Sequence, residues 1–122
     1  MSTRPHWRWV IIGPARSGST FHKDPNGTCA WNAPIVGRKK WIFLPPDCPP
    51  PGVHASEDGG SVAAPLSLGE WFIDYYSEYR EWLKREGREP LECICSPGDA
   101  VFVPQGWWHC ALNLDTPCVA VT

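Results

Sequence analysis

The sequence predicts a mainly β domain in which two sheets enclose a cavity and one helix covers the outside. Short runs of aromatic and β-branched residues, bounded by turn residues, recur along the chain. A Pro-Gly-Asp turn at residues 97–99 precedes a strand that ends just ahead of His109, a potential metal ligand. That order is typical of jelly rolls with a ligand cavity. Only residues 68–86 place apolar residues at convincing helical spacing.

Length and composition limit the classes of protein. The 122 residues allow one domain, 1–122, with a modest core. The net charge of -2 and the pI near 6.0 argue against direct nucleic-acid binding and against a membrane-surface protein. The N-terminus lacks the apolar core of a signal peptide, and no run of about 18 apolar residues occurs. We therefore expect a soluble intracellular protein and leave its oligomeric state open.

The six cysteines allow free thiols or a disulfide framework. Four of them lie in strand-like apolar runs, where a free cysteine acts as a small buried hydrophobe. Because no secretion signal is present, we favour reduced thiols. A secreted disulfide-rich domain would require the six residues to be oxidised in pairs: Cys29, Cys48, Cys93, Cys95, Cys110 and Cys118.

About seven short strands are predicted. They lie at residues 7–12, 28–35, 38–44, 91–95, 100–103, 107–112 and 117–122. Residues 16–20 are small and polar, so we interpret them as a loop or an irregular strand that leads to His22. Residues 45–65 are rich in proline and glycine and predict a polyproline-like loop, in which His54 is exposed to solvent.

One helix is predicted at about residues 68–86. Ser67 and Glu70 form a capping-box pattern at its start, and Gly87 ends it. An apolar stripe at helical spacing indicates a helix that packs on the sheet rather than a partner surface. The stripe consists of Leu68, Trp71, Phe72, Tyr75, Tyr79, Trp82 and Leu83.

A tight turn at residues 36–37 predicts a hairpin. With a two-residue loop, Asn32 pairs with Trp41 and becomes a diagonal neighbour of Lys39. A buried ammonium at Lys39 would need an anion. Strand alternation sends Lys40 to the opposite face, where solvent would be its partner.

A second two-residue turn, at residues 115–116, predicts another hairpin. Counting outward from this turn places His109 directly opposite Thr122. Both predicted hairpins therefore aim polar side chains at one cavity.

His22 and Asp24 are two residues apart, so on an extended strand both side chains leave the same face. Such a pair alone is more often a hydrogen-bonded contact than a metal site. With His109 it forms a set of two histidines and one carboxylate. This set is the facial triad of non-haem Fe(II) oxygenases, which leaves coordination positions open.

Several ordered motifs extend through the chain. They are G-P-x-R-S-G-[ST] at 13–19, H-x-D-P-x-G-T at 22–28, Ala30-Trp31-Asn32-Ala33, Gly37-Arg38-Lys39-Lys40-Trp41, and the stretch from Pro97 to Thr116. Together they resemble the JmjC family of Fe(II)- and 2-oxoglutarate-dependent oxygenases. Within that family they are most similar to the branch of the bifunctional arginine demethylase and lysyl hydroxylase, once called the phosphatidylserine receptor.

The resemblance implies a cupin-like double-stranded β-helix with Fe(II) held by His22, Asp24 and His109. It implies 2-oxoglutarate and dioxygen as co-substrates. The residues that match the 2-oxoglutarate contacts of the family are Asn32, Lys39 and Thr122, with Ser19 as a weaker match.

The resemblance also implies the reaction, hydroxylation of a C–H bond in a lysyl or arginyl side chain of a nuclear protein. On family grounds we favour lysyl hydroxylation. Oxidation of an N-methyl group would instead give demethylation.

Two alternatives stay open. The first is a non-catalytic cupin-like metal-binding or protein-interaction module, for example with Zn(II) in the same triad. Binding of 2-oxoglutarate that depends on the metal would distinguish the enzyme from this module. The second is that the chain is an incomplete JmjC core, because the family has eight core strands and an upstream region that supplies another 2-oxoglutarate contact. We therefore expect a truncated core with exposed sheet edges.

Overall fold

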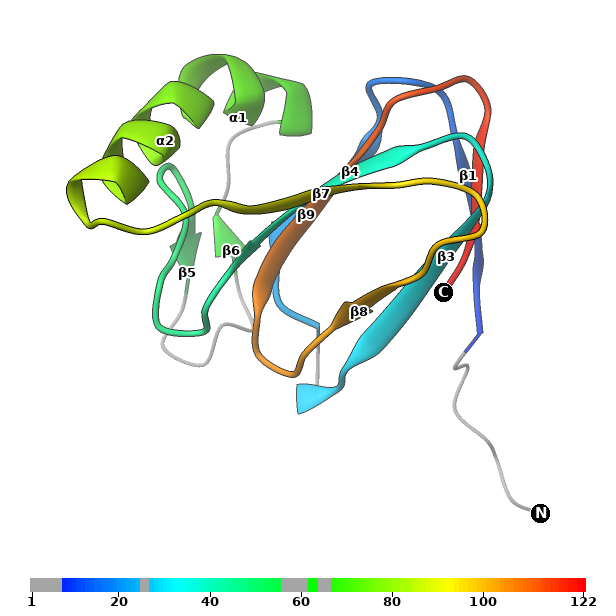
Figure 1. The fold of residues 1–122 in the computed structure, drawn as a ribbon, viewed down its shortest axis with the longest axis horizontal. Coiled ribbons are helices and arrows are strands. Elements are labelled where there is room, and N and C mark those ends of the chain that lie inside the picture. Colours follow the sequence, from blue (N-terminus) through cyan, green and yellow to red (C-terminus); the bar gives the residue numbers. More distant parts are fainter. Residues whose placement is uncertain (1–7, 25–26, 56–61, 64–66) are drawn as a thin grey trace.

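The computed structural model describes residues 8–24, 27–55, 62–63 and 67–122, and these residues form a two-sheet β-sandwich (Figure 1). We call one antiparallel sheet the open sheet. Its strands, in spatial order, are β1 (Val10–Gly13), β10 (Cys118–Val121), β3 (Ala30–Val36) and β8 (Val101–Val103). We call the other the covered sheet, and its strands are β2 (Gly18–His22), β9 (Trp108–Asn113), β4 (Lys39–Leu44) and β7 (Leu91–Cys95). The predicted mainly β, jelly-roll class is confirmed.

The structure contains one core strand more than predicted. It is β2, which the small polar residues before Phe21 had indicated as a loop or an irregular strand. Its ladder with β9 is irregular, with a register shift between Ser19 and His22. Gly18 allows the close approach, because a Cβ there would lie 1.9 Å from the carbonyl oxygen of Ala111. The predicted strand at 7–12 is present as β1, although Trp7 lies outside the described residues.

Two helices replace the single predicted helix. They are α1 (Leu68–Asp74) and α2 (Tyr76–Arg85), separated at Tyr75. The Tyr75 ring packs against Gly52, where a Cβ would lie only 2.7 Å from the ring, so a contact with a distant loop accompanies the break. The predicted start is confirmed, since the Ser67 hydroxyl accepts from the Glu70 backbone N–H. The predicted stop is confirmed as well, because Gly87 has a φ of 64° after the last turn.

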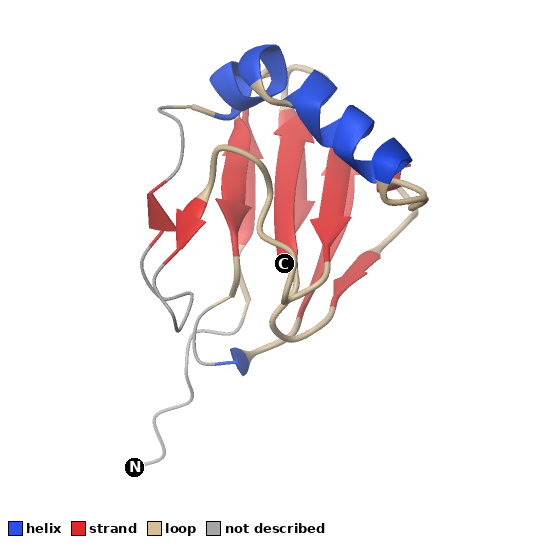
Figure 2. Ribbon diagram, turned by 90° about the vertical axis from the view of Figure 1, so that its left-hand side faces the viewer, coloured by secondary structure: helices blue, strands red, loops and turns tan. Residues whose placement is uncertain are grey.

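The helices lie across the outer face of the covered sheet (Figures 1 and 2). The aromatic stripe of the helices packs there, as predicted, against alternate residues of β2, β4 and β9. The buried members of this cluster are Phe21, Ile42, Leu44, Val53, Leu68, Trp71, Tyr79, Leu83, Trp108 and Cys110. Glu92 on β7 ties the helix to the sheet by accepting from the Tyr76 hydroxyl and pairing with Lys40 and Arg80.

A second, smaller apolar cluster lies between the two sheets. Trp41, Cys95 and Ala111 come from the covered sheet, and Val103 comes from the open sheet. Residues two positions apart on a strand share a face, so Lys39, two residues before Trp41, also belongs to the inner face of the covered sheet.

Both predicted hairpins are wrong. The strands on either side of residues 36–37 lie in different sheets, since β3 pairs with β10 and β8 while β4 pairs with β9 and β7. The strands on either side of residues 115–116 also lie in different sheets, β9 in the covered sheet and β10 in the open sheet. Asn32 faces Val101 rather than Trp41. Each tight connection therefore crosses from one sheet to the other. For the first connection a reason is visible: β4 is buried on both faces, so it packs against the open sheet on one side and the helices on the other.

The two crossing connections are clasped together. The Arg38 guanidinium donates to both carboxylate oxygens of Asp115, at 2.9 and 3.0 Å, and the Arg38 backbone N–H donates to the same group at 2.8 Å. Bidentate geometry makes this pair more specific than an ordinary surface ion pair. It fixes the turn that immediately precedes Lys39.

The proline-rich segment contains a short two-stranded ribbon, β5 (His54–Ala55) with β6 (Val62–Ala63), while residues 56–61 and 64–66 lie outside the described part. His54 is exposed, as predicted. All six cysteines are free thiols. Among the described residues, neither helix has the length and apolar character needed to cross a membrane.

Truncation of the helix-facing core should destabilise the fold. Ile42 is fully buried, so Ile42→Ala should lower the free energy of unfolding by about 2–5 kcal/mol in urea denaturation. Ile73 is 83% exposed on α1, so Ile73→Ala should change it by less than about 0.5 kcal/mol. Equal losses in the two variants would contradict the observed packing.

The clasp should make stability depend on acid pH. Hydrogen bonds from the Arg38 side chain, and then from its backbone, lower the pKa of Asp115. Because the folded pKa lies below the unfolded one, the stabilisation is present above the unfolded value and is lost as the pH falls through the folded value. At low salt, the wild type should exceed Asp115→Asn in urea midpoint at neutral pH, and the difference should vanish in acid. A constant difference would exclude this ionic contribution.

Candidate metal centre

Two histidines meet on adjacent strands of the covered sheet. His22 ends β2, His109 is the second residue of β9, and the two are direct register partners. Their ring centroids are 4.3 Å apart. The antiparallel ladder therefore brings together two residues that are 87 positions apart in the sequence (109 minus 22).

Backbone carbonyls orient both imidazoles. Nδ1 of His22 lies 2.7 Å from the Thr20 carbonyl oxygen, and Nδ1 of His109 lies 3.0 Å from that of Trp107. A carbonyl oxygen can only accept, so each Nδ1 carries the proton and donates it. Each Nε2 is then left with a free lone pair, as in metal-ligating histidines whose other nitrogen is held by the backbone.

Asp24 completes the group. Its Oδ1 lies 3.6 Å from Nε2 of His22 and 3.6 Å from Nε2 of His109, while its buried Oδ2 has no hydrogen-bond partner. Ligand atoms of all three residues lie within 4.8 Å of one another. Nitrogen and oxygen ligands bind a divalent ion such as zinc at about 2.0–2.2 Å, so neighbouring ligand atoms in such a site are about 3 Å apart. The donor set and its spacing fit a metal ion.

The segment that carries Asp24 is held in place by its neighbour. The Lys23 ammonium donates to the Pro46 carbonyl oxygen at 2.9 Å and lies 5.0 Å from the centre of the Trp108 ring. These contacts turn Lys23 toward the loop after β4, which leaves Asp24 to face the histidines.

One side of the group is buried and the other is open. The His109 side chain is only 5% exposed and that of Asp24 is 19% exposed, whereas His22 is 39% exposed. The pKa of His109 is lowered mainly by burial and also by the neighbouring His22. The hydrogen bond to the Trp107 carbonyl and the charge of Asp24 act in the opposite direction and raise it. A lowered pKa favours the neutral imidazole, which is the form that binds metals.

The other predicted site residues lie on inner faces but in different sheets. Lys39 and Ser19 belong to the covered sheet, while Asn32 and Thr122 belong to the open sheet or directly follow it. Thr122 lies beside Trp9, not opposite His109, and its hydroxyl donates to the Trp31 carbonyl oxygen at 2.8 Å. The sandwich, rather than the predicted hairpins, turns these residues toward the space between the sheets, where Asn32 and Lys39 are buried, Thr122 is half-buried and Ser19 is exposed.

Lys39 is the unusual member of this set. Its side chain is buried, and among the described residues no carboxylate pairs with its ammonium. Burial lowers the pKa of Lys39, although the neighbouring Cys118 and Cys95 oppose that shift. Lys40 points to the helices and pairs with Glu92. The prediction that Lys39 and Lys40 face opposite sides is therefore confirmed. The partner of Lys40 is a carboxylate, however, and not solvent as predicted.

Sequence reasoning missed two polar residues of the interior. Asn113 is buried and lies opposite Lys39 in the β4–β9 register. Its Nδ2 donates to the Ser17 hydroxyl, and its Oδ1 has no hydrogen-bond partner. Trp41 stacks 6.1 Å from His109, and its Nε1 is buried without a partner. Asn113 precedes a turn, where asparagine is ordinary. Nothing in the local sequence distinguishes it from a turn residue.

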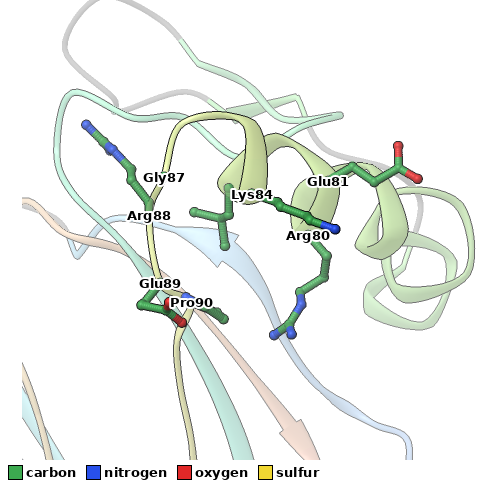
Figure 3. Close-up of a pocket in the computed structure, with 8 residues that line it drawn as sticks. Arg80, Glu81, Lys84, Gly87, Arg88, Glu89 and Pro90 are labelled. Carbon is green, nitrogen blue, oxygen red and sulfur yellow. The ribbon is translucent and has the colours of Figure 1, made fainter.

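A surface cleft of about 430 Å³ lies elsewhere, at the end of α2 and the loop to β7 (Figure 3). Its lining mixes basic residues, including Arg80 and Lys84, with the acidic Glu81 and Glu89. This mixture gives no single charge complementarity, and the cleft lies on the helix side of the covered sheet, outside the sandwich interior. We assign it no part in the metal centre.

Comparison with known proteins agrees with the geometry. The family model described as "JmjC domain, hydroxylase" matches residues 9–122. The chain belongs to the JmjC family. The match spans nearly the whole chain, and its range covers the positions of all the site residues predicted from the sequence.

The JmjC relatives are much longer proteins. The chain is 55% identical over 119 residues to "Arginine-specific demethylase JMJ22" of Arabidopsis thaliana, covering 98% of this chain and 23% of that protein. It is 48% identical over 124 residues to "Lysine-specific demethylase JMJ21" of the same plant, covering 98% of this chain and 12% of that protein. It is also 41% identical over 123 residues to "Bifunctional arginine demethylase and lysyl-hydroxylase psr-1" of Caenorhabditis elegans, covering 98% and 29%.

Proposed function

We propose that this chain forms the core of an Fe(II)- and 2-oxoglutarate-dependent dioxygenase that oxidises a lysyl or arginyl side chain of a protein. His22, Asp24 and His109 would hold the iron. Lys39, Asn32 and Thr122 would hold the 2-oxoglutarate, with Ser19 near them. A nuclear or cytoplasmic location remains a prediction.

One observation carries this proposal. Two imidazole lone pairs and a carboxylate oxygen converge within 4.8 Å, and the N–H groups of the two neutral rings already point to backbone carbonyls. Three acceptors facing one another without a donor repel each other. A divalent cation removes that repulsion, and two histidines with one carboxylate form the ligand set that non-haem Fe(II) oxygenases use.

The interior also supports an anion. A buried ammonium without a counter-charge is costly, so Lys39 requires a partner or loses its proton. The distal carboxylate of 2-oxoglutarate would supply that partner. The buried, unpartnered Oδ1 atoms of Asn32 and Asn113 are further polar groups in the same interior. A purely structural metal module would have no use for this anion site.

The division of labour follows from these positions. Fe(II), 2-oxoglutarate and dioxygen supply the oxidation of a C–H bond, with succinate and carbon dioxide as co-products. The protein binds and orients: two strands hold the imidazoles, Lys39 neutralises a carboxylate, and the Trp41 ring and the apolar residues around it exclude water. The exposed side of His22 is where a substrate side chain would approach.

The substrate class rests on the names of the relatives. They divide between arginine demethylation, lysine demethylation and lysyl hydroxylation. The same oxidation gives a stable alcohol on a side-chain carbon and demethylation on an N-methyl carbon. We therefore propose lysyl and arginyl side chains together, with lysyl hydroxylation as the favoured outcome.

The metal site can be tested without turnover. Binding of Mn(II), a redox-stable substitute for Fe(II), should weaken by about a hundredfold or more in His22→Ala, because one of three ligands is lost. His54→Ala is the matched control, since His54 is exposed and lies outside the group of three potential ligands. Electron paramagnetic resonance of free Mn(II) measures both affinities. Equal affinities in the two variants would contradict the assignment of His22.

The anion site has a matched control in the adjacent residue. In the presence of Mn(II), Lys39→Ala should weaken 2-oxoglutarate binding by about tenfold or more, because a buried charge pair is lost. Lys40→Ala should leave that affinity unchanged, since Lys40 faces the helices and pairs with Glu92. Isothermal titration calorimetry measures both. A larger loss in Lys40→Ala would refute the proposed orientation.

The reaction itself is tested with peptides. Peptides that carry lysine or methylated arginine, incubated with the chain, Fe(II), 2-oxoglutarate and air, should yield succinate together with an altered peptide. Gain of one oxygen atom in the mass spectrum indicates hydroxylation, and loss of a methyl group indicates demethylation. Succinate formation equal to that of His109→Ala would contradict the proposed activity.

A further inference from the structure

Asn113 is a buried polar residue of the interior to which the proposed reaction assigns no role. It is the last residue of β9, it is only 3% exposed, and its register partner on β4 is Lys39. We propose that Asn113 is a positioning residue of the 2-oxoglutarate site, whose Oδ1 accepts from the Lys39 ammonium and directs the other protons of that ammonium to the bound carboxylate. The proposal rests on the proposed function, because it assigns Lys39 to the co-substrate.

A chain of hydrogen bonds determines which way the Asn113 amide faces. The Ser17 hydroxyl donates its one proton to the Pro14 carbonyl oxygen at 2.6 Å. Toward Asn113 this hydroxyl can therefore only accept, so the amide atom 3.0 Å from it must be the donor, Nδ2. The other amide atom, Oδ1, is an acceptor that is buried and has no hydrogen-bond partner among the described residues.

The turn before β2 holds this amide in place. The Asn113 backbone N–H donates to the Ser17 carbonyl oxygen, and the Arg16 N–H donates to the Asn113 carbonyl oxygen, both at 2.8 Å. Gly13 approaches from the side, because a Cβ there would lie 2.9 Å from Nδ2 of Asn113. Turning the amide over would set its oxygen against the lone pairs of the Ser17 hydroxyl. The Oδ1 atom is therefore a fixed acceptor.

The Lys39 ammonium is the donor that fits this acceptor. Register partners on antiparallel strands have Cβ atoms about 4.5–5.5 Å apart, so the side chains of Lys39 and Asn113 leave the inner face of the sheet side by side. Two thiols are also near the ammonium. They belong to Cys95, the register partner of Lys39 on β7, and to Cys118, which donates its proton to the Arg38 carbonyl oxygen. Sulfur is a weak acceptor, so Oδ1 is the stronger partner.

An acceptor at this position acts on the ammonium and not on the co-substrate. Oδ1 would repel a carboxylate, so Asn113 does not bind 2-oxoglutarate itself. Burial lowers the pKa of Lys39, and a hydrogen bond to Oδ1 opposes that shift because it favours the charged form. Asn113 thus keeps Lys39 protonated and orients its ammonium. Of the three protons of the ammonium, two remain for the carboxylate.

The titration of Lys39 tests the contact without metal or co-substrate. In the chain labelled with carbon-13 lysine, NMR follows the Lys39 signal with pH, and its loss in Lys39→Ala identifies it. Asn113→Ala should lower the pKa of Lys39, because the acceptor is lost, and Asn113→Asp should raise it, because a carboxylate of the same shape replaces the amide. Leu112→Ala is the matched control, since Leu112 precedes Asn113 on β9 but packs against the helix-facing core. It should leave the titration unchanged.

Binding of 2-oxoglutarate tests the positioning. In the presence of Mn(II), each Asn113 variant should weaken 2-oxoglutarate binding by about tenfold or more in isothermal titration calorimetry. The alanine variant leaves the ammonium without orientation, and the aspartate variant occupies the ammonium itself. Leu112→Ala should bind 2-oxoglutarate as the wild type does. Circular dichroism checks that each variant is folded, and electron paramagnetic resonance should show unchanged Mn(II) affinity in all three.

Each outcome supports or overturns the proposal. A lowered Lys39 pKa together with weakened 2-oxoglutarate binding in Asn113→Ala supports it. Unchanged binding in a folded Asn113→Ala would overturn it and leave Asn113 a structural role, while the wild type would still bind and the proposed function would stand. If Asn113→Ala does not fold, unchanged binding in Asn113→Asp would overturn it instead. A wild type that binds no 2-oxoglutarate would refute the proposed function and this role with it, even where the Lys39 titration shows the contact.

Discussion

The register of β9 fixes both halves of the candidate site. This strand lies between β2 and β4 and pairs with each along its length. On one side it sets His109 beside His22, and on the other it sets Asn113 beside Lys39. A slip of one residue would turn both polar pairs out of the sandwich and bring apolar residues in. The same pairing that builds the core thus also places the metal ligands and the lysine.

The interior is polar where a simple β-sandwich would be apolar. Lys39, Asn32, Asn113 and His109 are all buried, and the Oδ1 atoms of Asn32 and Asn113 lack protein partners. Unpaired buried polar groups destabilise a fold, typically by about 1–3 kcal/mol each. Four of the six buried atoms without a partner among the described residues, on Asp24, Asn32, Trp41 and Asn113, lie in or beside this interior, whereas the other two, on Tyr79 and Trp108, lie in the helix-facing core. Such a group next to the candidate metal ligands is the pattern expected of a ligand site in an otherwise consistent fold. The fold can tolerate this interior because its main apolar core lies on the other side of the covered sheet, beneath the helices.

Local patterns in the sequence predict the elements well but not their partners. Local sequence determines the strand runs, the helix start at Ser67 and the helix end at Gly87, so these features could be predicted from the sequence. The division into two sheets could not, since a tight turn serves equally for a hairpin and for a crossing between sheets. The break at Tyr75 is accompanied by a contact with Gly52, which is distant in sequence. For the site, the spacing of His22 and Asp24 and the family motifs indicated the triad, whereas Asn113 gave no local signal because its role depends on cross-strand register.

The central claim is that the three convergent acceptors bind iron and that the interior beside them binds a keto acid. The most direct test is an anaerobic titration of the chain with Fe(II) and then 2-oxoglutarate, followed by visible absorption. The account predicts a charge-transfer band that requires both additions and is absent from a folded His22→Ala variant. A folded wild-type chain that shows no band at saturating concentrations of both would contradict the claim.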